Sequence, residues 1–147
     1  PKRIWPKILL ASIPLFLFGA LGYMALNGEI AQIRQTAVTW LILNAVLAGI
    51  GVILARGHPL SALVGALASP ITSLNPTLAA GWFAGYTQFK IDSPTVGDTK
   101  DFLALDDISL FWKNRVGKVL MVTAMGNVGS MAGAWIAGGA IIGILVG

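Results

Sequence analysis

Two uninterrupted apolar runs near the start of the chain constrain its fold more than any other feature. Residues 8–26 and residues 37–55 each form a stretch of nineteen residues without a charged side chain. A helix of that length is roughly 28 Å long at ~1.5 Å per residue, which is enough to cross a hydrocarbon core ~30 Å thick. Each run therefore predicts a transmembrane helix. The short polar link at 29–35 predicts that the two helices pack as an antiparallel hairpin.

The composition excludes the common classes of soluble protein. Of the 147 residues, 56% are hydrophobic and 11% are charged, the mean hydropathy is +0.79, and there is no cysteine. Soluble domains carry about 25% charged residues, so a soluble enzyme, a secreted disulfide scaffold and a disordered tail are excluded. The chain has ten Lys and Arg residues and six Asp and Glu residues. In so apolar a chain, this excess of basic residues is a signal of membrane topology rather than of nucleic-acid binding. We expect residues 1–147 to form a single transmembrane domain, in contact with the lipid bilayer and cut from a longer protein.

Residues 58–89 differ from the two long runs. They contain two short apolar segments, 58–69 and 77–89, on either side of the polar sequence SPITSLNPT. Pro70 is expected to end the first helix, and Asn75, followed by Pro76, is expected to cap the second. Half-length helices of this kind predict either a re-entrant hairpin or two short crossings.

The remaining segments complete the predicted fold class. A polar loop at 90–105 leads to an amphipathic helix at 106–118, typical of a membrane–water interface. The last apolar run, 119–142, predicts a third full span. The fold class expected is all-α: a polytopic membrane helical bundle with three full spans, a broken or re-entrant helical hairpin and one interfacial amphipathic helix.

The distribution of basic residues predicts the topology. With the N-terminus in the cytoplasm, a segment 58–89 that enters and leaves on one side places nine of the ten basic residues inside and only Arg34 outside. A single crossing by that segment leaves four inside and six outside. The positive-inside rule favours the first arrangement. We therefore expect a cytoplasmic N-terminus and an external C-terminus.

At SPITSLNPTLAAGWFAG and FWKNRVGKVLMVTAMGNVGS the sequence resembles the C-terminal membrane region of the TraB/PrgY family of pheromone-shutdown proteins. The resemblance covers essentially the whole chain. It implies a location in the cell membrane of a prokaryote, and an N-terminal soluble domain proposed to be a metal-dependent peptidase that inactivates peptide pheromones. No residues of this chain match that domain's Gly/His motifs, and the only histidine is His58.

Polar residues in and around the broken helix form the candidate site. They are Ser69, Thr72, Ser73, Asn75 and Thr77 of the break, together with Asn44 and Asn127 of the long spans. One interpretation is structural, because such side chains cap helix ends and join helices inside a membrane. The other is a pore or binding site, because half-helices that meet at mid-membrane often surround a substrate.

Small residues at four-residue spacing predict close helix packing. They are Gly81 and Gly85 in the second half-helix, and Gly129, Gly133 and Ala137 in the last span. Such ridges permit close packing within one chain or between two copies, and from the ridge of the last span we expect a homodimer.

The sequence favours a membrane anchor without catalysis of its own. All five aspartates fall between residues 92 and 107, outside the spans, and His58 has no neighbouring metal ligand, so we expect no catalytic, cofactor or metal site here. The function expected is to anchor, and to oligomerise, the family's soluble domain. The alternative is a small pore or transporter with its polar site at SPITSLNPT.

Overall fold

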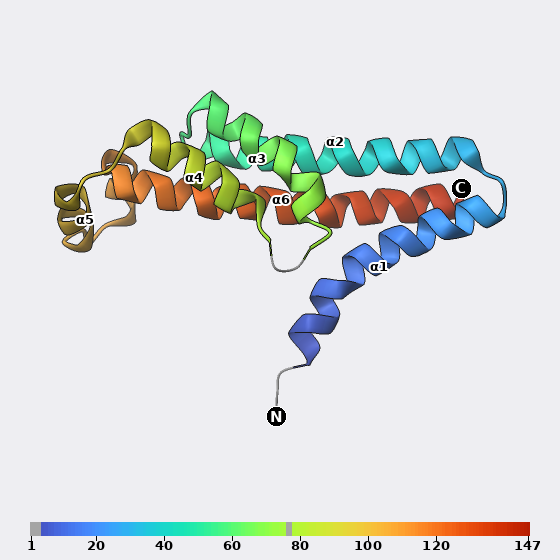
Figure 1. Cartoon of the computed structure of the whole chain (residues 1–147). Coiled ribbons are helices and arrows are strands. Elements are labelled where there is room, and N and C mark those ends of the chain that lie inside the picture. Colours follow the sequence, from blue (N-terminus) through green and yellow to red (C-terminus); the bar gives the residue numbers. More distant parts are fainter. Residues whose placement is uncertain (1–3, 76–77) are drawn as a thin grey trace.

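The computed structural model describes residues 4–75 and 78–147, and every regular element in these residues is helical. Three long helices form the frame, namely α1 (Trp5–Leu26), α2 (Ile30–Leu54) and α6 (Arg115–Val146). Two shorter helices pack along α2 and α6, namely α3 (Pro59–Thr72) and α4 (Ala80–Asp92). Helix α5 (Val96–Leu103) and the 3₁₀ helix η1 (Ile108–Lys113) lie at the end of the bundle where α6 begins (Figure 1).

The three expected spans are confirmed as helices that are long and apolar enough to cross a membrane. Helix α2 begins earlier than its apolar run, at Ile30, because residues 30–35 include good helix formers such as alanine, glutamine and arginine. Thr36 is consequently buried inside α2, where its hydroxyl donates a 3.4 Å hydrogen bond to the Met24 sulfur of α1.

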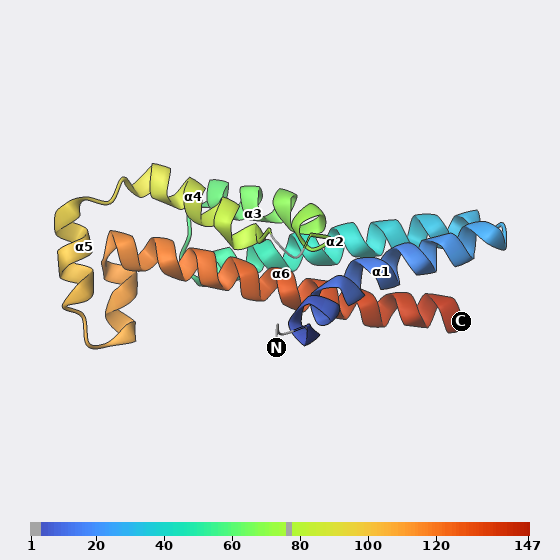
Figure 2. The same ribbon diagram turned by 60° about the horizontal axis from the view of Figure 1, so that its bottom comes forward.

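The most extensive packing joins α2 and α6, which run antiparallel side by side (Figure 1; Figure 2). Their backbones approach closely where glycines face the other helix: Gly133 meets Leu43, Gly129 meets Leu47, and Gly51 meets Met125. Ala137, the next small residue of the α6 series, is fully buried. The Gly129–Gly133–Ala137 ridge therefore packs within the chain, and its close approach to α2 leaves no room there for a second copy.

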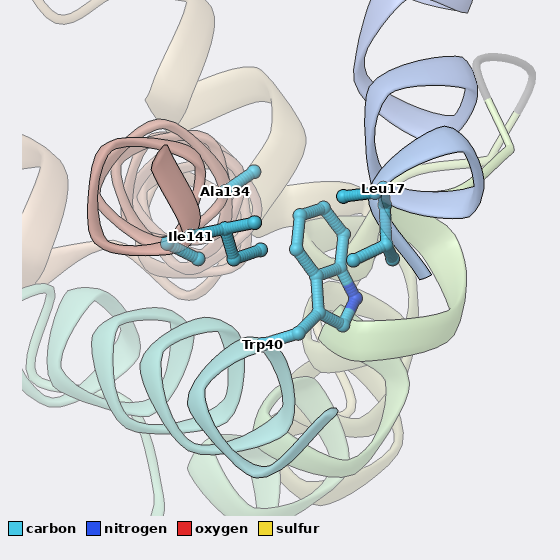
Figure 3. Packing of buried hydrophobic residues seen from close by; sticks show 6 residues of the cluster. Leu17, Trp40, Ala134 and Ile141 are labelled. Atoms are coloured by element: carbon cyan, nitrogen blue, oxygen red, sulfur yellow. The ribbon is translucent and has the colours of Figure 1, made fainter. Parts of the chain in front are cut away.

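Besides the Thr36–Met24 contact, helix α1 is attached to this frame through one apolar cluster. The indole of Trp40 reaches from α2 into the space between Leu17 of α1 and Ala134 and Ile141 of α6 (Figure 3). Beyond this cluster α1 diverges from the other helices towards the N-terminus (Figure 1). Its position thus depends on a small area of side-chain packing, whereas α2 and α6 are joined along their length.

The segment between α4 and α6 differs from the expected loop and amphipathic helix. Residues 90–105 contain α5, which begins with a capping box in which Thr95 and Asp98 exchange hydrogen bonds. The Thr95 backbone N–H holds the pKa of the Asp98 carboxyl below its usual range. Residues 106–118 do not form one helix, because Asn114 ends η1 and caps α6 by accepting a 3.0 Å hydrogen bond from the Gly117 N–H.

The glycine contacts predict how substitutions change stability. A Cβ at Gly133 would lie 2.6 Å from the Leu43 carbonyl oxygen and 2.9 Å from the Asn44 Cα, so Gly133→Ala should lower the free energy of unfolding by about 1–3 kcal/mol. Gly22→Ala is the matched control, because nothing lies within 4 Å of a Cβ there. It should be neutral or stabilising by up to ~1 kcal/mol through helix propensity.

Circular dichroism during unfolding in mixed detergent micelles measures both changes. Equal stability of the two variants would contradict the α2–α6 packing described here.

Candidate functional site

Helices α3 and α4 form an antiparallel hairpin whose two outer ends lie together. Where α3 begins, the His58 backbone N–H and the Ser61 hydroxyl both donate to the Gln88 side-chain oxygen, at 2.8 and 2.9 Å. The Gln88 amide in turn donates to Asp92 at 2.8 Å. Ser61 and Gln88 are fully buried, so this network fixes the end of α4 against the start of α3. The end of α3 and the start of α4, which face each other across the tip of the hairpin, consequently lie part-way along the bundle (Figure 1).

Four of the expected site residues, joined by Ser130, form one hydrogen-bonded cluster near this tip. The hydroxyls of Ser69 and Ser130 lie 2.7 Å apart, and Ser73 donates to the Asn44 side-chain oxygen at 2.7 Å while lying 3.2 Å from Ser130. Thr72 donates to the Ser69 carbonyl at 3.3 Å. The cluster thereby joins α2, α3 and α6 at one level of the bundle.

Helix α3 continues through Pro70 to Thr72, so the expected end at residue 69 is wrong by about one turn. Proline deprives the helix of only one donor. Here the Pro70 carbonyl accepts a 3.1 Å hydrogen bond from the Trp40 indole of α2. This contact lies in the buried part of the protein and helps to hold the last turn of α3 in place.

Helix α4 begins at Ala80, so the expected cap at Asn75 is also wrong. The first turn is instead capped from another helix, because the Asn127 side-chain oxygen of α6 accepts a 2.7 Å hydrogen bond from the Gly81 N–H. The Asn75 carbonyl accepts from the Leu78 N–H in a turn at 3.1 Å. Thr77 and Pro76 lie outside the described residues.

The expected small residues of α4 allow this cap. A Cβ at Gly81 would collide with the Thr123 carbonyl and the Asn127 side chain, and a Cβ at Gly85 would collide with the Thr123 hydroxyl. Both glycines therefore lie directly on α6. Their close approach brings Asn127 within hydrogen-bonding distance of the α4 backbone.

A cavity of about 190 Å³ opens beside the cluster. Its polar lining consists of Thr72, Ser73, Asn75, Asn127 and Ser130, and Ile13 of α1 covers one side. Ligand pockets commonly exceed ~300 Å³, so this space suits a few waters or a small solute. In the parts of the chain that the structure describes, every buried side-chain nitrogen or oxygen has a hydrogen-bond partner.

The interhelical role of Gln88 was not expected from the sequence. Gln88 is the only amide side chain of α4, and an amide within a largely apolar segment is the available signal for such a role. The contact of Trp112 was also missed: its indole donates to the Ala55 carbonyl at the end of α2, at 3.0 Å, and the Arg56 guanidinium lies over its ring.

Among the described residues there is no group of three or more side chains that could hold a metal ion.

The fold and the site together define an all-helical domain with three helices long and apolar enough to cross a membrane and with a hydrogen-bonded polar cluster between helices. The chain belongs to the TraB family, because the family model described as "TraB family protein, C-terminal domain" matches residues 5–146. It is 31% identical over 149 residues to the uncharacterized protein MJ1365 of Methanocaldococcus jannaschii. That match covers 98% of this chain but only 37% of the relative. No solved structure is significantly similar.

The Asn127 cap predicts a specific loss of stability. Asn127→Ala leaves the Gly81 N–H without its acceptor inside the protein, which should cost about 1–3 kcal/mol and speed amide exchange at Gly81. Thr87→Val is the control, because that hydroxyl bonds only the Phe83 carbonyl of its own helix, on the exposed side. Hydrogen exchange and detergent unfolding measure the two effects. An Asn127 variant as stable and as protected as the Thr87 variant would refute the cap.

Proposed function

We propose that this chain is the membrane domain that anchors a longer TraB-family protein in the bilayer. The observation that carries the proposal is an interior whose polar groups bond one another: glycine contacts join α2 to α6, and polar side chains join α3 and α4 to these two helices. Such a core suits a rigid anchor more than an open conduit. The relative's additional length supports a further domain beside the membrane part.

The re-entrant character of α3 and α4 is part of this proposal. Contacts between the antiparallel helices α2 and α6 recur every four residues. Leu43 faces Gly133, Leu47 faces Gly129, and Gly51 faces Met125. The apolar run 37–55, which ends at the C-cap residue of α2, is roughly 28 Å long and nearly matches the hydrocarbon core. Asn44 and Ser130 then lie near the middle of the bilayer. Ser73, at the end of α3, bonds both residues, so in this proposal α3 reaches the midplane and α4 leads back to the same side.

Labelling tests this topology directly, because the chain has no cysteine. Single-cysteine variants Arg56→Cys and Lys90→Cys should react with an impermeant maleimide from the same, cytoplasmic side of sealed vesicles. Arg34→Cys should react from the other side, in accord with the positive-inside rule. Reaction of positions 56 and 90 from opposite sides would show that α3 and α4 cross only once.

Assembly and activity follow the same proposal. We propose a homo-oligomer, in the simplest case a dimer, through glycines of α6 with open space around them, Gly138 and Gly143. Light scattering of the detergent-solubilised protein gives its mass.

A peptidase activity on peptide pheromones would belong to the additional soluble domain. The described residues here hold no metal-ligand group, so no catalytic step is assigned to them.

The alternative, a small pore or transporter, is favoured by one observation: the cavity of about 190 Å³ with Asn75 and Asn127 in its wall. The polar hairpin tip at mid-bundle is the kind of place where transporters hold solutes.

Liposomes distinguish the two functions. The anchor proposal predicts that reconstituted protein gives no more solute or ion flux than empty liposomes, and that a fluorescent protein fused ahead of residue 1 stays with the membrane through salt and carbonate washes. Flux that Asn75→Ala abolishes would establish the transporter instead. A fusion released by carbonate would refute the anchor.

A further inference from the structure

A second, larger hollow lies at the end of the bundle, away from the polar cluster. Its volume is about 290 Å³. Three elements form it: the last turn of α4, the start of α5 and the first two turns of α6. Its apolar lining includes Phe89, Val96, Val116, Val119 and Leu120, and Thr99 of α5 adds a hydroxyl.

The helix contacts place this hollow at the edge of the hydrocarbon core. On α4, Gly81 meets Asn127 and Gly85 meets Thr123, so one more step of four residues brings Phe89 level with Val119. The same stepwise pairing of α2 with α6 brings Ala55, the end of the apolar part of α2, level with residue 121. The hollow therefore lies where acyl chains give way to phospholipid headgroups. This placement rests on the membrane orientation proposed above.

Helix α5 runs across the end of the bundle, steeply inclined to α6 (Figure 2). Val96, Lys100 and Leu103 are spaced i, i+4 and i+7 and share one face. Val96 and Leu103 are 75% and 77% exposed although they lie outside the long apolar helices. On the opposite face α5 carries Asp98 and Asp101.

Independent contacts hold α5 in this orientation. The Phe102 ring packs edge-on against Phe111 of η1 with ring centroids 4.9 Å apart. The Asn114 side-chain amide donates to the Asp98 carbonyl at 2.9 Å. Val96 and Thr99 line the hollow, so this edge of α5 borders the ends of α4 and α6. Lys100 and Leu103 continue the same face and are exposed, and the two aspartates lie on the opposite face.

We propose that this hollow, with the Val96–Lys100–Leu103 face of α5, binds an anionic phospholipid of the surrounding leaflet. The upper part of an acyl chain fills the apolar hollow. Lys100 shares the exposed face of α5 with Val96, and Lys90 lies in the last turn of α4 with its ammonium over the Tyr86 ring, 5.4 Å from the centroid. These two basic residues of the elements that form the hollow attract the lipid phosphate. A soluble acidic partner would meet Asp98 and Asp101 first, so the charge arrangement favours the bilayer side.

Depth measurements test the placement of α5. In liposomes, a fluorophore on Leu103→Cys should be quenched by lipids that carry a spin label near the headgroup. The matched variant Asp101→Cys, on the opposite face, should be quenched by aqueous iodide. A fluorophore on Leu41→Cys, exposed on α2, should be quenched by deep spin labels, and it reports insertion independently of α5.

Each outcome has a defined meaning. Iodide quenching at position 103 with deep quenching at position 41 overturns the lipid site and leaves the membrane anchor intact. Shielding of position 103 from both quenchers shows that a second copy or another protein segment covers it, and this also overturns the proposal. Failure of deep quenching at position 41 would refute the membrane placement itself.

Lipid selectivity tests the role of the two lysines. Spin-labelled phosphatidylglycerol should be immobilised by the protein in preference to phosphatidylcholine. This preference should fall roughly fivefold for each of Lys90→Gln and Lys100→Gln, the factor that corresponds to ~1 kcal/mol per basic residue at an anionic surface. Arg34→Gln, at the other end of the bundle, is the control and should leave it unchanged. A preference that survives the double lysine variant would overturn the assignment.

Discussion

The backbones of α2 and α6 approach each other closely over about one turn on either side of Gly129, and the other elements are placed by that contact. Gly51, Gly129 and Gly133 have no side chains, so the facing carbonyl groups come within distances that any Cβ would obstruct. Inside a bilayer the hydrophobic effect gives no net attraction between helices, and van der Waals packing of small residues takes its place. The pair forms the rigid frame against which α3 and α4 can rest as half-length helices.

A half-length hairpin in a membrane leaves helix ends in the interior, and their backbone groups need partners. The long helices supply them. Asn127 caps the start of α4, and the Trp40 indole bonds the last turn of α3. Asn44 and Ser130 then bind the serines of α3. The candidate site is thus the place where the frame and the hairpin are joined, and its small cavity remains beside that junction.

The sequence predicted the parts of this fold that depend on local pattern. The three long helices follow from apolar runs of sufficient length, and the hairpin follows from short segments around SPITSLNPT. The start of α4 was misplaced because its cap, Asn127, lies far along the chain, and local rules favour Asn75. Helix α5 was missed although its Thr95–Asp98 capping box is a local signal. The α6 glycine ridge was recognised, but only the structure shows that α2 covers it.

Polar residues at fixed positions along the helices also give this bundle its register. Apolar helices in lipid can slide or rotate past one another with little change in buried apolar area. A shift of α6 by one residue against α2 and α4 separates Ser130 from Ser69 and Asn127 from Gly81, and it moves Gly129 and Gly133 off the facing carbonyl groups. Each lost partner leaves a polar group exposed to hydrocarbon, which is costly. The same side chains that resemble a transport site therefore act here to select one arrangement of the helices over its neighbours.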